Sequence, residues 1–294
     1  MPTIEGQPTR LERLAVVAVS ALQRAGLDRL VYAEALRRLG KRFLLREERV
    51  EGERVIASGP GRGLWLSLLP DTPNSYWMGT HEPDMQAALL KHVKPGMTVY
   101  DCGANVGYYA LIFAKLIGPR GRVYAFEPSP ASLKCLRAGR ELNGFENLTV
   151  VPQAAWDKKE MLRFVRGAPD SSLVTDHVEG VFGESAETNN IRESLIEVPA
   201  TSLDHFVYEE GHAPPDFIKM DIEGAEGKAI AGARRVIAEH RPVLLLEIHG
   251  APGREVWSIL KELNYTAVNI STGEVPRTAE EFAIYVRQYL ALAV

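Results

Sequence analysis

The sequence has little of what marks several common protein classes. Its 294 residues include only two cysteines, Cys102 and Cys135, too few for a disulfide framework and without C-x-x-C spacing. It has no G-x-S-x-G nucleophile elbow and no zinc-like array of Cys and His. We therefore expect neither a disulfide scaffold nor a zinc domain, and a reducing compartment is favoured.

Long apolar runs and a strong net charge are also missing. No run approaches the roughly 20 apolar residues that span a bilayer, so we expect no membrane span. Residues 14–22 (LAVVAVSAL) follow Arg10 and Arg13 as a signal peptide would, but the run is short and Glu5 and Glu12 interrupt its basic flank. We interpret it as part of an amphipathic helix and expect a cytoplasmic protein. A net charge of -4 does not favour a nucleic-acid partner.

The sequence does contain a regular alternation of strand-like and helix-like segments from Met97 onward. The expected strands are 98–102, 122–126, 148–152, 217–220, 243–248, 265–270 and one near 282–287, and the expected helices are 107–117, 130–143, 224–238 and 253–263. This alternation predicts an α/β fold, a parallel sheet with helices on both faces. Residues 160–197 interrupt the pattern with a possible strand at 162–165 and a polar stretch at 171–190, either a lid or a surface loop.

The N-terminal part follows another pattern. Residues 9–40 have apolar residues at helical spacing, and residues 49–70 have the pattern of a β-hairpin around Gly59-Pro60-Gly61. We expect residues 1–75 to form a helical and hairpin extension and residues 76–294 the main domain. The helix either packs on that domain or serves as a docking surface, which leaves a homodimer possible.

The segment Asp101-Cys102-Gly103-Ala104-Asn105-Val106-Gly107 lies between an expected strand and an expected helix. Its glycines permit a tight turn and the close approach of a ligand. Dinucleotide-binding turns have glycine where this chain has Asp101, because a carboxylate repels a pyrophosphate. A carboxylate attracts the ammonium group of S-adenosylmethionine, which has no phosphate. The turn therefore favours that cofactor over a nicotinamide.

Glu127 follows the second expected strand, where an acid can accept hydrogen bonds from both hydroxyls of a ribose. A purely structural alternative remains open, in which Asp101 caps a helix and Glu127 is a surface acid before a proline turn. The glycines and the two acids together favour a nucleoside site.

The chain carries, in this order, DCGANVGYYALIFAKLIG, VYAFEPSP, ELNGFENLTVVPQAA, TSLDHF, FIKMDIEGAEGKAIAGA and LLLEIHG. Together these segments resemble the FkbM-type S-adenosylmethionine-dependent methyltransferases, over roughly residues 76–290. GANVGYY and IKMDIEGAE are the most specific of them. The resemblance implies a Rossmann-like class I methyltransferase domain in residues 76–294. It also implies methyl transfer to oxygen, often a hydroxyl of a sugar or natural product.

The turn and the resemblance together define an expected cofactor site. Its members are Asp101, Gly103, Asn105, Gly107, Glu127, Gln153 and Glu82. Gln153 stands where many class I enzymes have an acid that binds the adenine amine. We expect its side-chain carbonyl, or a backbone carbonyl, to bind this amine instead. Glu82 precedes the first core helix, where the family often has an acid; it lines the pocket or is simply a first-turn acid.

Polar residues end two expected strands that the class I order makes neighbours. Lys219 and Asp221 share one face at the end of strand 217–220, and Glu247 and His249 share one at the end of strand 243–248. We expect them to converge beside the methyl donor, since ligands bind at the carboxyl ends of such strands. An alcohol acceptor must lose a proton during transfer, and Asp221 or His249 is the candidate general base.

Other interpretations of these residues stay open. Asp221, Glu247 and His249 have the right ligand types for a divalent cation, although their spacing matches no strong metal motif. Lys219 and Glu226 are candidates for a buried ion pair that only fixes the turn. The alternatives for the whole chain are an N-methyltransferase of nucleic acid or protein and a non-catalytic nucleoside-binding module. The absence of an Asn/Asp-Pro-Pro-aromatic motif argues against N-methylation.

Overall fold

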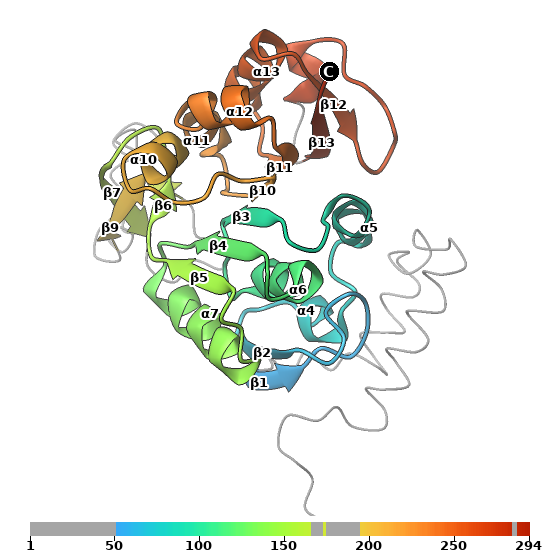
Figure 1. The fold of residues 1–294 in the computed structure, drawn as a ribbon, viewed down its shortest axis with the longest axis vertical. Helices are drawn as coiled ribbons and strands as arrows, with labels where there is room; N and C mark the ends of the chain where they lie inside the picture. Colours follow the sequence, from blue (N-terminus) through green and yellow to red (C-terminus); the bar gives the residue numbers. More distant parts are fainter. Residues whose placement is uncertain (1–50, 166–172, 175–194, 284–286) are drawn as a thin grey trace, which may run out of the picture.

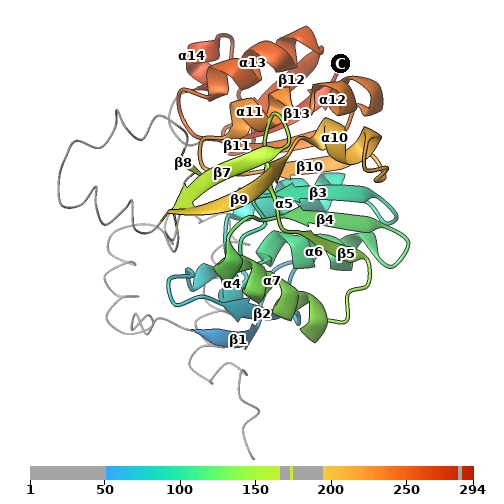
Figure 2. The same cartoon turned by 90° about the vertical axis from the view of Figure 1, so that its left-hand side faces the viewer.

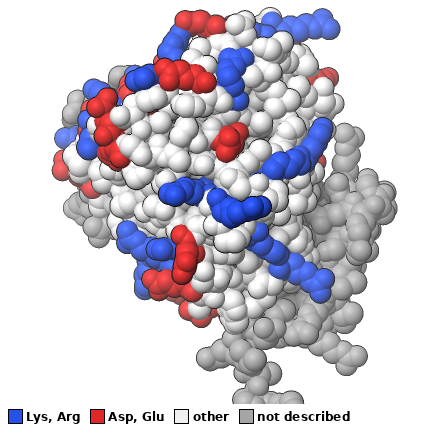
Figure 3. Space-filling view, viewed as in Figure 1, with Lys and Arg blue, Asp and Glu red and all other residues white. Residues whose placement is uncertain are grey.

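The structure is a computed structural model that describes residues 51–165, 173–174, 195–283 and 287–294. The expected helix 9–40, the apolar run 14–22 and most of the polar stretch 171–190 lie outside them. Within the described part, no helix has the length and apolar content that a bilayer crossing requires. On the face drawn in Figure 3, acidic and basic side chains are both present, and uncharged atoms occupy most of the surface between them.

A seven-stranded sheet forms the centre of the molecule, in the order β12-β13-β11-β10-β3-β4-β5 (Figure 1). Its strands are β3 (Thr98–Cys102), β4 (Arg122–Phe126), β5 (Leu148–Val151), β10 (Phe217–Met220), β11 (Val243–Ile248), β12 (Tyr265–Asn269) and β13 (Arg287–Ala293). Neighbours are parallel, except that β13 is antiparallel to β11 and β12. The expected Rossmann-like α/β fold is confirmed, with a mostly parallel sheet.

Helices cover both faces of this sheet (Figures 1 and 2). One face carries α4 (Ser75–Met78), α5 (Pro83–His92), α6 (Tyr108–Ile117) and α7 (Pro130–Leu142), and the other carries α10 (Leu203–Tyr208), α11 (Glu226–Ala231), α12 (Arg234–His240), α13 (Gly253–Glu262) and α14 (Ala279–Phe282). Successive strand residues point to opposite faces, so Val99 packs in the first core and Tyr100 in the second. Each face therefore has its own apolar core.

The order of the strands reverses beside β3. From β3 the chain adds β4 and β5 on one side, then returns to place β10 and β11 on the other. Lys219 of β10 is in register with Asp101 of β3. Ligands of open α/β sheets bind at the carboxyl ends of the strands that flank such a reversal.

The expected hairpin is confirmed as β1 (Gly52–Val55) and β2 (Trp65–Leu68). Asn143, after α7, accepts the N–H of Trp65 at 2.9 Å and donates to its carbonyl oxygen at 2.7 Å. Leu66 is fully buried in the same cluster as α6. The hairpin thus packs on the main core, and the domain boundary at residue 75 stays a prediction.

A second, smaller sheet follows β5, in the order β6-β9-β7-β8. It consists of β6 (Ala154–Ala155), β7 (Glu160–Val165), β8 (Leu173–Val174) and β9 (Leu195–Thr201). The strand expected at 162–165 is confirmed within β7, and β9 was missed. In Figure 2 the β7–β9 pair extends beyond the central sheet.

The single helix expected over 224–238 is wrong, because α11 and α12 are separate helices. Asp204 accepts hydrogen bonds from the backbone N–H groups of Arg235 and Val236, at 3.0 and 2.8 Å. These donors belong to the first turn of α12, and such donors need partners outside their helix. The side chain of Asp204, from α10, therefore caps the start of α12 and makes it a helix separate from α11.

The strand expected near 282–287 is also misplaced. Residues 279–282 form the short helix α14, because Thr278 accepts the N–H of Glu281 at 3.2 Å as an N-terminal cap. The described strand β13 covers Arg287–Ala293. Thr278 and Glu281 have the spacing of a capping box, which the strand assignment overlooked.

Candidate active site

A cavity of about 430 Å³ opens at the carboxyl ends of β3, β4, β10 and β11. The predicted site residues that line it are Glu82, Gly103, Asn105, Glu127, Lys219, Asp221 and Glu247. Its volume falls within the range of small-molecule and cofactor pockets. Asp101, Gly107, Gln153 and His249 lie outside the lining.

Close packing explains the glycine turn after β3. Gly103 has φ 81°, and a Cβ atom there would overlap the carbonyl oxygen of Asp221. Gly107 has φ 95°, and a Cβ atom would lie 2.7 Å from a methyl carbon of Leu136. Both positions favour glycine because other residues disfavour this region of φ, and at Gly103 the backbone of Asp221 also leaves no space for a side chain.

Glu127 is anchored beside this turn. Its Oε2 accepts the N–H of Asn105 at 2.8 Å and its Oε1 accepts the N–H of Ser129 at 2.7 Å. Each carboxylate oxygen has two lone pairs, so capacity for a ligand hydroxyl remains on both. Burial raises the pKa of Glu127 to about 7, against the opposing effect of these two hydrogen bonds.

Asp101 faces a lysine rather than the cavity. Its side chain is fully buried, and its Oδ1 lies 3.7 Å from Nζ of Lys219. Burial raises the pKa of Asp101 to about 6, and Lys219 opposes the rise. The expected contact between Asp101 and a cofactor ammonium group stays a prediction.

Lys219 is the buried cation at the reversal of the sheet. It lies 3.3 Å from Oδ2 of Asp221 and donates to the carbonyl oxygen of Gly103 at 3.3 Å. Burial would lower the pKa of Lys219, but Asp221 and Asp101 hold it above its usual value. The alternative of an ion pair between Lys219 and Glu226 is wrong, since Lys219 pairs with these two aspartates.

Glu226 instead faces His249. Its Oε1 lies 2.9 Å from Nδ1 of His249 and accepts the N–H of Gly224 at 3.1 Å. Burial would lower the pKa of His249, but the hydrogen bond to Glu226 and the charges of Glu226, Glu223 and Asp221 raise it to about 9.

Glu247 and Glu82 are joined by a residue that the sequence did not indicate. The Nε2 of Gln288 donates to Glu82 Oε1 and to Glu247 Oε2, each at 2.8 Å. Tyr109 donates its hydroxyl to Glu82 Oε2 at 2.7 Å. Burial, with the charges of Asp221 and Glu82, raises the pKa of Glu247 to about 7. No sequence pattern indicated Gln288 as a site residue, because the last strand was expected to end at residue 287.

The expected adenine contact involves Gln153, which follows β5. The backbone N–H of Gln153 donates to the carbonyl oxygen of Val151 at 2.8 Å, and its Oε1 is buried without a hydrogen bond. Ala154 and Ala155 line the cavity at this place. The role of Gln153 stays a prediction.

Comparison with known proteins supports the expected family. The model of the methyltransferase FkbM domain matches residues 101–267. The chain is 27% identical over 208 residues to the 31-O-demethyl-FK506 methyltransferase FkbM of Streptomyces tacrolimicus, covering 61% of this chain and 77% of that protein. It is 26% identical over 183 residues to the hexuronic acid methyltransferase AglP of Haloferax volcanii, covering 62% and 68%.

Other matches are shorter or purely structural. Protein-L-isoaspartate O-methyltransferases match over 30 to 52% of their own length. The crystal structure of the methyltransferase FkbM from Methylobacillus flagellatus is 18% identical with a TM-score of 0.41, covering 74% of this chain and 55% of that one. The family match extends over more than half of the chain, which therefore belongs to the FkbM methyltransferase family.

Proposed function

We propose that this protein transfers the methyl group of S-adenosylmethionine to a hydroxyl oxygen of a sugar, glycolipid or natural-product acceptor. The observation that carries the proposal is that one cavity joins the glycine turn and Glu127 to the carboxylates of Asp221 and Glu247. We call the part of the cavity beside the glycine turn and Glu127 its nucleoside end, and the part beside Asp221 and Glu247 its acid end. A cofactor and an acceptor bound at these two ends would share one cavity.

At the nucleoside end, Glu127 would accept the two ribose hydroxyls. Asn105 is held against Glu127 by its backbone N–H, and Gly103 lines the same cavity. Glu82 and Lys219 lie further along the same cavity, where the amino-acid part of the cofactor would extend.

At the acid end, the reaction is an in-line displacement at the methyl carbon. Alignment of acceptor oxygen, methyl carbon and sulfur contributes several kcal/mol of rate enhancement, roughly up to 7–11 in favourable cases. The acceptor hydroxyl also gives up its proton, and Asp221 and Glu247 are the predicted catalytic residues that line the cavity with carboxylates. Lys219 holds Asp221 in place by its ion pair.

Calorimetry with S-adenosylmethionine and S-adenosylhomocysteine tests the cofactor, and absence of binding to both by the intact protein would contradict the proposal. The acceptor is tested by methyl transfer to a panel of glycosides and hydroxylated natural products. Methylation of tRNA or peptide nitrogen, but of no hydroxyl compound, would favour the N-methyltransferase alternative. Tight nucleoside binding without any turnover would favour a binding module.

Asp221→Asn tests the acid end separately. This variant should keep its affinity for S-adenosylhomocysteine and lose at least about 100-fold in kcat, the usual effect of removing a general base. Asp216→Asn is a matched control outside the cavity, where the aspartate accepts the backbone N–H of Thr98 at 2.8 Å. Unchanged turnover of Asp221→Asn would remove Asp221 from the mechanism.

A further inference from the structure

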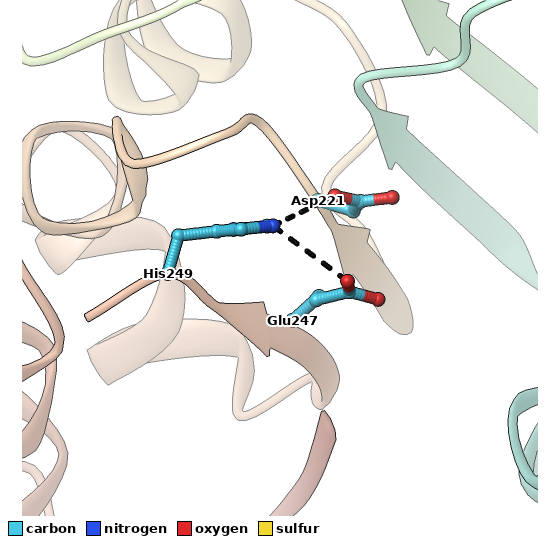
Figure 4. A group of neighbouring side chains, drawn as sticks. All are labelled: Asp221, Glu247 and His249. Carbon is cyan, nitrogen blue, oxygen red and sulfur yellow. Dashed lines mark ion pairs between the residues drawn. The ribbon is translucent and has the colours of Figure 1, made fainter. Parts of the chain in front are cut away.

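The ends of β10 and β11 bring three metal-binding side chains together (Figure 4). Asp221, Glu247 and His249 each offer one donor atom, and these atoms all lie within 4.8 Å of one another. His249 Nε2 is 3.6 Å from Glu247 Oε1 and 4.0 Å from Asp221 Oδ1. The side chains point toward a common space at the edge of the cavity that Asp221 and Glu247 line.

The imidazole of His249 is oriented by a residue outside this group of three. Its Nδ1 lies 2.9 Å from Oε1 of Glu226, which is fully buried and is itself fixed by the N–H of Gly224. Its Nε2 also lies 3.3 Å from Oε2 of Glu223, and these carboxylates favour the protonated imidazole. A metal ion at Nε2 would displace the proton of that nitrogen, while Glu226 keeps the proton on Nδ1. Buried Glu226 thus presents Nε2 of His249 to the two carboxylates.

The charges of the residues around the cavity also favour a bound cation. Among the described residues that line it, Lys219 is the single Lys or Arg, whereas Glu82, Asp221, Glu223 and Glu247 are all acidic. Lys219 is already engaged with Asp101 and Asp221. Several carboxylates in a partly buried space repel one another unless a cation joins them.

We propose that Asp221, Glu247 and Nε2 of His249 bind one divalent transition-metal ion, with its open coordination positions toward the acceptor. One imidazole and two carboxylates suit Mn²⁺, Fe²⁺ or Zn²⁺ better than Ca²⁺, which takes oxygen ligands. Metal–ligand bonds of about 2.0–2.2 Å require the three donor atoms to move closer by a modest amount. The inference rests on the proposed methyl transfer for its purpose: the ion would hold the acceptor hydroxyl and lower its pKa, so that its proton passes to water. Asp221 would then act on the acceptor through the ion, as its ligand, instead of as the direct base.

Mn²⁺ is the probe for the test. The full-length protein is dialysed against a chelator and titrated with Mn²⁺ while electron paramagnetic resonance records the free ion. We expect one bound ion per chain and at least about tenfold weaker binding in Glu247→Gln and His249→Gln. Glu226→Gln should weaken binding by about 10–100-fold, the usual effect of changing a residue that orients a metal-binding histidine.

His205→Gln is the matched control, because His205 also lies 3.3 Å from a glutamate, Glu210, but outside the cavity. Its Mn²⁺ affinity should equal that of the wild type. Binding that is not stoichiometric, or that Glu247→Gln, His249→Gln and Glu226→Gln all leave unchanged, would overturn the metal site.

Pulsed electron paramagnetic resonance of Mn²⁺ bound to the wild-type protein tests the site without depending on how the variants fold. Coupling of bound Mn²⁺ to an imidazole nitrogen is expected, and its absence would also overturn the site. S-adenosylhomocysteine affinity, measured on the same sample, separates the two proposals. Cofactor binding without Mn²⁺ binding overturns the metal site alone, and Mn²⁺ binding without cofactor binding overturns the methyl-transfer function.

Discussion

Glu127 combines a structural and a proposed binding role at the residue scale. Its two oxygens hold the backbone N–H groups of Asn105 and Ser129, so the residue fixes the glycine turn and the start of α7 at once. Glu127 also lines the cavity. A site of this kind depends on charge, because the carboxylate accepts ribose hydroxyls better when it is ionised.

The affinity for S-adenosylhomocysteine should therefore depend on pH. With a pKa of about 7 in the free protein, Glu127 is mostly protonated at pH 6 and mostly ionised at pH 8. Ribose hydroxyls favour the ionised form, so binding should strengthen about tenfold from pH 6 to pH 8, as a single titration over this range gives. The nearby charges that act on Glu127 are those of Asp101 and Lys219.

Calorimetry across that pH range checks this expectation. Glu127→Gln should bind more weakly and lose the pH dependence that Glu127 causes. Glu146→Gln, at an exposed position, should reproduce the wild-type profile. An unchanged slope in Glu127→Gln would assign the titration to another group.

The sequence could predict the residues of the turn because they are contiguous, and Glu127 because it directly follows the next expected strand. Gly103, Asn105 and Glu127 were expected together, and the structure places all three at the cavity. It could not predict Gln288, which reaches Glu82 and Glu247 from 206 and 41 positions away in the chain. Nor could it show that Glu226 pairs with His249 instead of Lys219, because that choice depends on the positions of three elements.

At the scale of elements, spacing identified strands and helices, and tertiary contacts set their limits. The strands at 98–102 and 122–126 have the predicted bounds, because each is an apolar run closed by a turn. The break between α11 and α12 depends on Asp204 from α10, and no local pattern in 224–238 contains that information. The sequence thus gives the elements well where the signals are local.

The turn between β3 and α6 offers a test at this scale. Gly103→Ala should lower the free energy of unfolding by about 2–5 kcal/mol, because it adds the cost of a left-handed φ to an overlap with Asp221. Gly144→Ala has a similar φ of 65° but no atom within 4 Å of the added carbon. It should cost only about 1–2 kcal/mol.

Urea denaturation of the two variants separates the cost of a left-handed φ, which both share, from the cost of the overlap with Asp221. Equal losses would show that the contact between Gly103 and the Asp221 backbone does not constrain the turn. In that case the close approach of β3 and β10 at the cavity would have to be maintained by other contacts, such as the Lys219 ion pairs.

At the scale of the whole molecule, the cavity lies between two parts of the sheet. β3 and β4, with α6 and α7, supply the nucleoside end, whereas β10 and β11 supply the acid end. The sequence predicted both groups, and only the sheet order shows that they share one cavity. A ligand that fills it contacts residues from both sides of the reversal.

Cofactor binding should therefore stabilise the whole described fold. A ligand at about 100 times its Kd adds about 2.7 kcal/mol to the stability of the folded state. For a domain of this size, each kcal/mol raises Tm by about 2–4 °C, so S-adenosylhomocysteine should raise Tm by about 5–10 °C. NAD⁺ should not raise it, because the carboxylates that line the cavity would repel its pyrophosphate. Scanning calorimetry of the protein with each ligand checks this, and Glu127→Gln at the same S-adenosylhomocysteine concentration should show a smaller rise. A rise with NAD⁺ alone would point instead to a dinucleotide site, and would contradict both the cofactor assignment and the methyl transfer that depends on it.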